Sequence, residues 1–210
     1  AKNHKAAANA YSEAYLRSPS SKLILRMYQS YKLANDEKPA LEALERGAKK
    51  YPDNADIRLA LATEYHLDGR LEEAAQEYER LIELRPDNIT AINNLAWIYH
   101  EKGDTRARAL ADRAYQLAPE RPVIVDTYGW IELHSDNKVE GLRAIQDAAV
   151  HAPTNPTIRY HLAVALQMNG QVDAARKELE RLLKTDSDFP ELTDAQKLLE
   201  KLSSSASHQQ

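Results

Sequence analysis

The feature that most constrains this chain is a regular spacing of prolines. Five of them follow one another at intervals of 33, 34, 33 and 34 residues, namely Pro19, Pro52, Pro86, Pro119 and Pro153. Each ends a stretch with helical apolar spacing, because proline cannot donate the helix hydrogen bond and disfavours helix at the residue before it. The spacing therefore predicts a series of similar helical units.

Between the prolines, apolar side chains recur on one face of a helix. Ile92, Leu95, Ala96 and Tyr99 lie at positions i, i+3, i+4 and i+7 of such a face. A glycine such as Gly103 then breaks the helix, and a second amphipathic helix follows before the next proline. Each unit is therefore predicted to be a helical hairpin.

This pattern resembles the tetratricopeptide repeat, in which Leu-Ala/Gly-x-x-Tyr is followed by Gly, by Ala-x-x-x-Tyr and by Pro. The resemblance implies an all-α fold, a right-handed superhelical solenoid of antiparallel helix pairs. It predicts a single array over residues 1–202. The predicted parts are a half repeat at 1–19, full repeats at 21–54, 55–88, 89–121, 122–155 and 156–189, a capping helix at 190–202, and a disordered tail at 203–210.

Two units depart from the pattern. Unit 89–121 is one residue short between Gly103 and Pro119, which predicts an atypical second helix. Unit 122–155 has Glu132 where tyrosine is expected and Asp136 where glycine is expected. Neither change is expected to break the stack, because the stability of a repeat array is spread over neighbouring units.

Composition excludes several classes of protein. The chain of 210 residues has no cysteine, which excludes disulfides, thiol catalysis and cysteine-ligated zinc. Its net charge is −4, and no basic stripe suggests a nucleic-acid partner. The sequence has no apolar run of about 18 residues, so it predicts no membrane-spanning helix. Phosphate loops, H-E-x-x-H and nucleophile elbows do not occur, so we expect a non-catalytic protein without cofactor or metal.

The candidate site follows from the resemblance, which implies that the first helix of each hairpin lines a concave groove holding a protein or peptide. Trp97 and Trp130 occupy equivalent positions in adjacent units, and two interpretations stay open: packing between first helices, or contact with a ligand. Asn94 is either a clamp for a partner's backbone or an exposed polar residue. The complete predicted set is Asn93, Asn94, Trp97, His100, Asp126, Trp130, His134, Tyr160 and His161.

A narrower resemblance concerns residues 92–183. The deletion after Gly103 and the segment Asp-Thr-Tyr-Gly-Trp-Ile at 126–131 are similar to bacterial arrays linked to exopolysaccharide and envelope assembly. The tetratricopeptide lipoproteins that accompany the exosortase/PEP-CTERM sorting system are the specific likeness. This resemblance implies an exported, periplasmic protein with a longer array upstream, with a cytoplasmic protein as the alternative.

Two functions therefore stay open. One is a protein-interaction scaffold in envelope polysaccharide assembly or protein sorting, and the other is an array whose groove holds a glycan or small molecule. The half repeat adds a further expectation, because Ala7, Tyr11 and Ala14 form an apolar stripe without a preceding helix. We expect weak self-association through residues 1–19.

Overall fold

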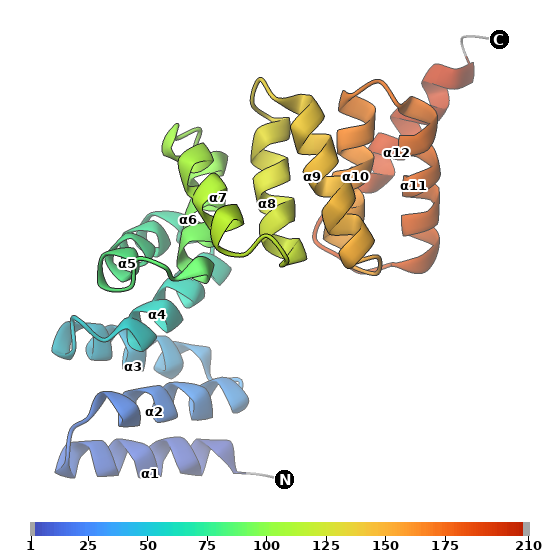
Figure 1. The fold of residues 1–210 in the computed structure, drawn as a ribbon. Helices are drawn as coiled ribbons and strands as arrows, with labels where there is room; N and C mark the ends of the chain where they lie inside the picture. Colours follow the sequence, from blue (N-terminus) through green and yellow to red (C-terminus); the bar gives the residue numbers. More distant parts are fainter. Residues whose placement is uncertain (1–2, 208–210) are drawn as a thin grey trace. The chain divides into compact units, whose positions relative to one another are not determined.

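The computed structural model describes residues 3–207, with side chains through residue 204, and these residues form twelve helices and no strand (Figure 1). The predicted all-α helical repeat is confirmed. The helices are α1 (His4–Arg17), α2 (Ser21–Leu33), α3 (Glu37–Lys50), α4 (Ala55–Leu67), α5 (Leu71–Leu84), α6 (Ile89–Glu101), α7 (Arg106–Leu117), α8 (Pro122–Leu133), α9 (Lys138–His151), α10 (Pro156–Met168), α11 (Val172–Thr185) and α12 (Leu192–Ser207).

The chain divides into two compact units, Ala1–Ile98 and Tyr99–Gln210, with the boundary inside α6. In the first unit the consecutive pairs from α1–α2 to α4–α5 pack together, and α2 also touches α4. In the second unit α7 to α12 do the same, and α8 also touches α10. Contact between neighbours is the organisation expected of a repeat array, but the repeat pattern alone predicted one array and did not reveal the division within α6.

Four hairpins turn from the first helix to the second through one arrangement. A residue with positive φ ends the first helix, and the next N–H donates to a carbonyl five residues earlier, as Arg70 N does to Tyr65 O at 2.8 Å. Glycine takes this position at Gly69 (φ 71°), Gly103 (φ 68°) and Gly170 (φ 77°). Asn35 takes it in the first full hairpin with φ 52°, a substitution that sequence reasoning missed.

Asparagines begin three of the first helices, two residues after a unit-ending proline. The side-chain oxygens of Asn54, Asn88 and Asn155 accept from the N–H three residues later, at 3.0, 2.9 and 3.2 Å. Each therefore satisfies a backbone donor that the helix itself leaves unpaired.

The two departing units keep their hairpins. α7 has 12 residues, whereas α3, α5, α9 and α11 each have 14. The carboxylate of Glu132 is 3% exposed. It accepts from Arg108 Nε at 2.7 Å, Arg108 Nη2 at 2.9 Å and Asn137 Nδ2 at 2.8 Å. The charge that replaces tyrosine is therefore buried, and it is hydrogen-bonded to Asn137 and to the exposed Arg108.

Two glycines bring α8 and α9 together. A Cβ atom on Gly141 would lie 2.5 Å from Leu133 N, and one on Gly129 would lie 2.8 Å from Ile145 Cγ1. Neither distance leaves room for a methyl group, so these backbones approach more closely than alanine would permit.

The last helix differs from its prediction. α12 runs to Ser207, so residues 203–207 are helical where a disordered tail was expected; residues 208–210 lie outside the described part of the chain. Ser203 and Ser204 donate to the carbonyls of Leu199 and Lys201 at 2.8 and 2.9 Å, so their hydroxyls bond within the helix.

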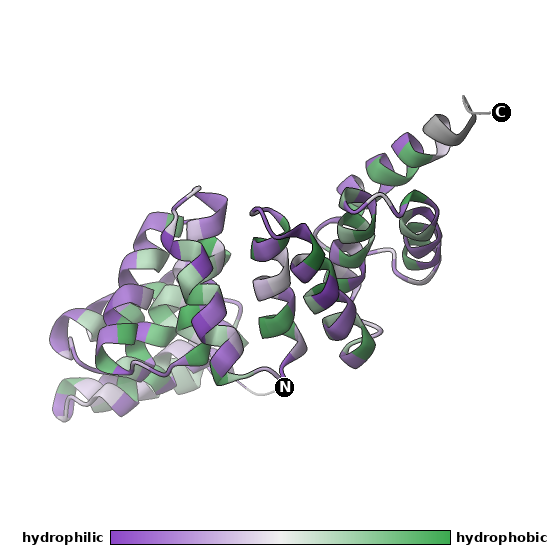
Figure 2. Cartoon of the chain, turned by 45° about the horizontal axis from the view of Figure 1, so that its top comes forward, coloured by the Kyte–Doolittle hydropathy of each residue, from purple (hydrophilic) through white to green (hydrophobic). Residues whose placement is uncertain are grey.

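The helices share the amphipathic character that the repeat pattern predicts, with hydrophobic and hydrophilic residues interleaved along each (Figure 2). Across residues 3–207, no helix is long and apolar enough to cross a membrane.

Candidate partner-binding face

Four predicted site residues form a row of rings in the second unit. His161 of α10 stacks on Trp130 of α8, with ring centroids 3.9 Å apart and planes 28° apart. His134, the residue after α8, lies 4.4 Å from Trp130, and His100 of α6 lies 5.4 Å from His134. We call His100, His134, Trp130 and His161 the imidazole–indole row.

Asp126 fixes one end of the row. Its Oδ2 lies 2.8 Å from His161 Nδ1, and the two side chains are 7% and 3% exposed. Because a carboxylate oxygen accepts, Nδ1 of His161 carries the hydrogen in this bond. Asp126 Oδ1 is buried and has no hydrogen-bond partner among the described atoms. The pair therefore holds the imidazole against Trp130 and leaves one carboxylate oxygen unsatisfied.

Local bonds also orient the other imidazoles. His134 Nδ1 lies 2.8 Å from the carbonyl oxygen of Trp130, so that nitrogen donates and the ring is tied to α8. Burial, followed by the neighbouring His134, lowers the pKa of His100 below its ordinary value. We therefore expect His100 to be neutral at pH 7.

Tyr160 adds a phenol beside the row. Its ring centroid lies 6.0 Å from that of His161, and its side chain is half-buried. Burial raises the pKa of Tyr160, and the carboxylates of Asp194 and Glu191 raise it further. Its hydroxyl is therefore neutral at physiological pH.

The three remaining predicted residues lie on α6 in the first unit. Asn94 Nδ2 donates to the hydroxyl of Tyr78 on α5 at 2.9 Å, a contact that the sequence did not predict. Asn93 is buried, and its Oδ1 has no hydrogen-bond partner among the described atoms. Trp97 is half-buried. Since Trp97 and Trp130 belong to different compact units, their shared groove stays a prediction.

Known protein families account for this architecture. A model described as TPR repeat matches residues 62–103, and one described as Tetratricopeptide repeat matches residues 133–202. The chain belongs to the tetratricopeptide repeat family. The imidazole–indole row thus lies mainly on first helices of tetratricopeptide hairpins.

Two curated relatives of this chain are bacterial proteins. The TPR repeat-containing protein PA4667 of Pseudomonas aeruginosa is 25% identical over 152 residues, which cover 70% of this chain and 26% of that protein. Cellulose synthase 1 operon protein C of Komagataeibacter xylinus is 28% identical over 128 residues, 60% of this chain and 10% of that protein. The chain therefore spans about a quarter or less of either relative.

A solved structure agrees with the tetratricopeptide fold. A tetratricopeptide repeat protein from Parabacteroides merdae superposes with a TM-score of 0.78 over 93% of this chain and 78% of its own. The two sequences are 16% identical, so this likeness concerns the fold alone.

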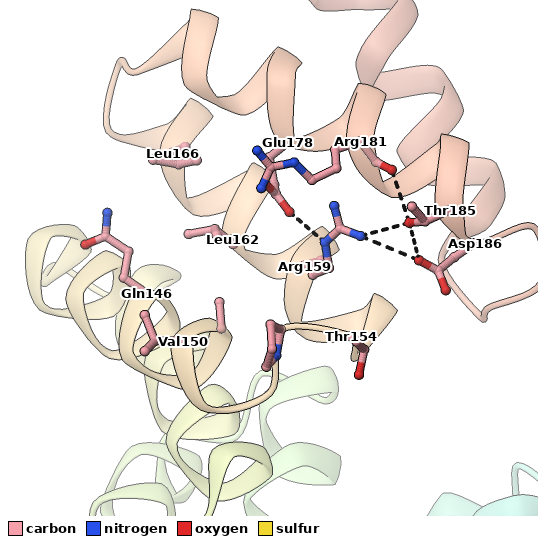
Figure 3. Close-up of a pocket in the computed structure, with 12 residues that line it drawn as sticks. Gln146, Val150, Thr154, Arg159, Leu162, Leu166, Glu178, Arg181, Thr185 and Asp186 are labelled. Atoms are coloured by element: carbon pink, nitrogen blue, oxygen red, sulfur yellow. Dashed lines mark hydrogen bonds and ion pairs between the residues drawn. The ribbon is translucent and has the colours of Figure 1, made fainter.

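Sequence reasoning assigned no function to the second helices of this tetratricopeptide array. The structure holds a pocket of about 690 Å³ beside two of them (Figure 3). It is lined by the second helices α9 and α11, by the first helix α10, and by the loops that follow α9 and α11. A signal existed in the sequence, because Arg58 and Glu77 in one unit match Arg159 and Glu178 in another.

Proposed function

We propose that this tetratricopeptide array is a non-catalytic scaffold that binds a protein partner on the imidazole–indole row. The observation that carries the proposal is the buried Asp126–His161 pair, which fixes an imidazole against Trp130. Rings held in place before binding lose little conformational freedom when a partner arrives. Fixed aromatic side chains are also the residue type that most often anchors a protein interface.

The row and its neighbours suit an extended peptide. Ring faces offer apolar contact, while the imidazoles of His100 and His134 and the Tyr160 hydroxyl can bond to main-chain groups. In the first unit, Asn93 and Asn94 of α6 supply amides. Asn94 already bonds to Tyr78, so its role as a backbone clamp requires that bond to be shared or exchanged.

A glycan is the second candidate ligand. Aromatic rows also suit sugar rings, and one relative is named after a cellulose synthase operon. This name, with the resemblance to exosortase-linked lipoproteins, supports a role in exported polysaccharide assembly or protein sorting. The periplasmic location implied by that role is part of the proposal.

The test compares peptide and glycan probes on the chain and on Trp130→Ala. A library of random twelve-residue peptides is selected against the chain, and cellohexaose is titrated separately. We expect selected peptides to lose about tenfold or more in affinity on Trp130→Ala, since aromatic anchors contribute about 2 kcal/mol. Leu67→Ala, which alters a leucine 74% exposed in α4, is the control and should bind normally.

Thermal melting separates binding from packing, because Trp130 also contacts the core of the second unit. Retained melting temperature with lost binding supports the proposal. Peptides that bind Trp130→Ala as tightly as the unmodified chain contradict it, and saturable cellohexaose binding in their place favours the glycan function.

Self-association through residues 1–19 is a separate proposal. Ala7, Tyr11 and Ala14 are half-buried in α1, and Leu16 is 79% exposed. We expect sedimentation velocity to show concentration-dependent association that Leu16→Glu reduces. A strict monomer at high concentration would contradict it.

A further inference from the structure

The pocket lined by α9, α10 and α11, which we call the α9–α11 pocket, shares no residue with the imidazole–indole row. On α10, Arg159, Leu162 and Leu166 are spaced three and four residues apart, so they share one helix face that lines this pocket. Val150 lines it from α9, and Figure 3 shows Val150 across from the side chains of α10 and α11. A volume of about 690 Å³ lies in the range of pockets that hold small molecules or single side chains.

The polar wall of this pocket is neutral overall. Arg159 donates from Nε to Glu178 at 2.7 Å and from Nη1 to Thr185 at 3.0 Å, and Nη1 lies 3.5 Å from an Asp186 carboxylate oxygen. Arg181 lies 3.9 Å from the other oxygen of Glu178. Two guanidinium groups thus face two carboxylates, as Figure 3 shows, and this balance favours an uncharged occupant.

One donor in this wall is unused. Arg159 is 6% exposed, and its Nη2 is buried without a hydrogen-bond partner among the described atoms. Buried donors normally have partners, so this nitrogen is an unsatisfied group enclosed within the wall.

The first unit contains a counterpart of this pocket. A pocket of about 450 Å³ is lined by eight residues, and each has a counterpart 101 residues later that lines the larger pocket. Arg58 and Glu77 form an ion pair there, as Arg159 and Glu178 do. The interval of 101 residues equals three repeats, so the two pockets occupy the same place in their hairpins.

The two pockets differ in how they are filled. In the first unit Tyr65 donates its hydroxyl to Glu45 at 3.0 Å, which joins α4 to α3. In the second unit Leu166 and Gln146 stand at these positions. Leucine is shorter than tyrosine and cannot form the bond, so the larger pocket keeps the space that a phenol would fill.

We propose that the α9–α11 pocket receives an aromatic side chain from an uncharged segment of a partner protein. The partner's ring lies against Val150, Leu162 and Leu166. The Gln146 amide bonds to a hydroxyl on that ring, in the place of Glu45. This site adds a second contact to the array, on helices other than those of the imidazole–indole row.

The test uses N-acetyl-tyrosinamide as a neutral aromatic probe and the ¹⁵N-labelled chain of residues 1–210. We expect saturable changes in amide chemical shift in α9, α10 and α11 at millimolar probe. N-acetyl-tyrosine, which adds a carboxylate, and N-acetyl-leucinamide, which lacks the ring, should each bind at least threefold more weakly. Shifts confined to the imidazole–indole row, or no saturable shift at 20 mM probe, would overturn the proposal.

Two exposed valines of α9 provide matched variants. Val150, at the pocket, is 74% exposed and Val139, near the start of the helix, is 76% exposed. We expect Val150→Glu to abolish probe binding and Val139→Glu to leave it unchanged. Equal effects of the two changes would overturn the proposal.

Leu166→Tyr fills the pocket from within by copying Tyr65. We expect it to abolish probe binding while the melting temperature is retained. Normal probe binding by a folded Leu166→Tyr chain would overturn the proposal. If this variant does not fold, the Val150→Glu comparison decides, because an exposed position can be changed without altering the core.

Discussion

At the residue scale, the buried Arg159–Glu178 pair replaces an apolar contact. Arg159 and Glu178 side chains are 8% and 14% exposed. The corresponding positions hold Ile24 and Ala43 in the first full unit, and Val125 and Ala144 in the fourth. In these units the two positions are therefore either both apolar or both charged. A buried ion pair behaves in this way because either partner alone is an uncompensated charge.

This pairing predicts a rescue. Arg159→Ile alone should destabilise the chain by about 3 kcal/mol or more, because it removes the nearest and most buried partner of the Glu178 carboxylate. Adding Glu178→Ala, which reproduces the Ile24/Ala43 arrangement, should bring stability back to within about 1 kcal/mol. Urea denaturation of both variants and of Glu178→Ala measures the coupling. Strictly additive effects would contradict this account.

A second residue-scale prediction concerns pH. The folded structure lowers the pKa of His100 through burial and through His134. A histidine with a depressed folded pKa contributes its stability in full above the unfolded pKa of about 6.5, and this contribution is lost as pH falls through the folded pKa. We expect the melting temperature of the chain to fall between pH 7.5 and pH 5, and to fall less for His100→Gln. An identical pH dependence in the two proteins would show that His100 is not responsible.

At the element scale, the sequence predicted the hairpins well because most boundaries have a local chemical cause. Prolines follow the second helices, and positive-φ residues end four of the five first helices, the exception being α8. Asn35 was missed because asparagine only occasionally adopts the left-handed conformation that glycine adopts freely. The extension of α12 was missed because Ser203 and Ser204 are as typical of loops as of helices until their hydroxyl bonds are known.

The candidate site was less predictable than the hairpins. Residue types and helix faces indicated which side chains share a surface. The bonds that join Asp126 to His161 and Asn94 to Tyr78 depend on rotamers across separate helices. The α9–α11 pocket depends on a size difference between Tyr65 and Leu166, which becomes informative only once the surrounding walls are known.

The last helix gives the element-scale prediction. Ala195 and Leu202 of α12 are buried in one cluster with Leu179 and Leu182 of α11. A chain ending at Asp188 should be less stable by about 3 kcal/mol or more, because several leucine-sized apolar contacts are lost. It should also associate through the exposed apolar face. Calorimetry and sedimentation test both effects, and a chain ending at Ser204 is the control. Equal stability of the two truncated chains would mean that α12 is not a cap.

At the whole-molecule scale, the contacts within each unit join mostly neighbouring helices, so a local defect should stay local. Gly141 gives the sharpest test, because any side chain there meets the backbone of Leu133. We expect Gly141→Ala to weaken the second unit by about 1–3 kcal/mol. Hydrogen exchange should accelerate in α8 to α10 and remain unchanged in α2 to α4.

The control for this prediction is Arg143→Ala, which truncates a side chain 81% exposed on the same helix. It should leave exchange unchanged throughout. Uniform acceleration of exchange by Gly141→Ala, including α2 to α4, would mean that the chain unfolds as one cooperative body.

The 101-residue interval between equivalent pocket residues has a consequence for the gene. Unequal crossing-over between the coding segments for residues 55–88 and 156–189 would remove or duplicate three repeats in frame. In the shorter product Asn54 would join Pro156, and Arg159 would meet the α3 neighbours that now surround Arg58. Each Arg–Glu pair lies within one exchanged hairpin, so both products would keep their buried pairs while the array changes length by three hairpins.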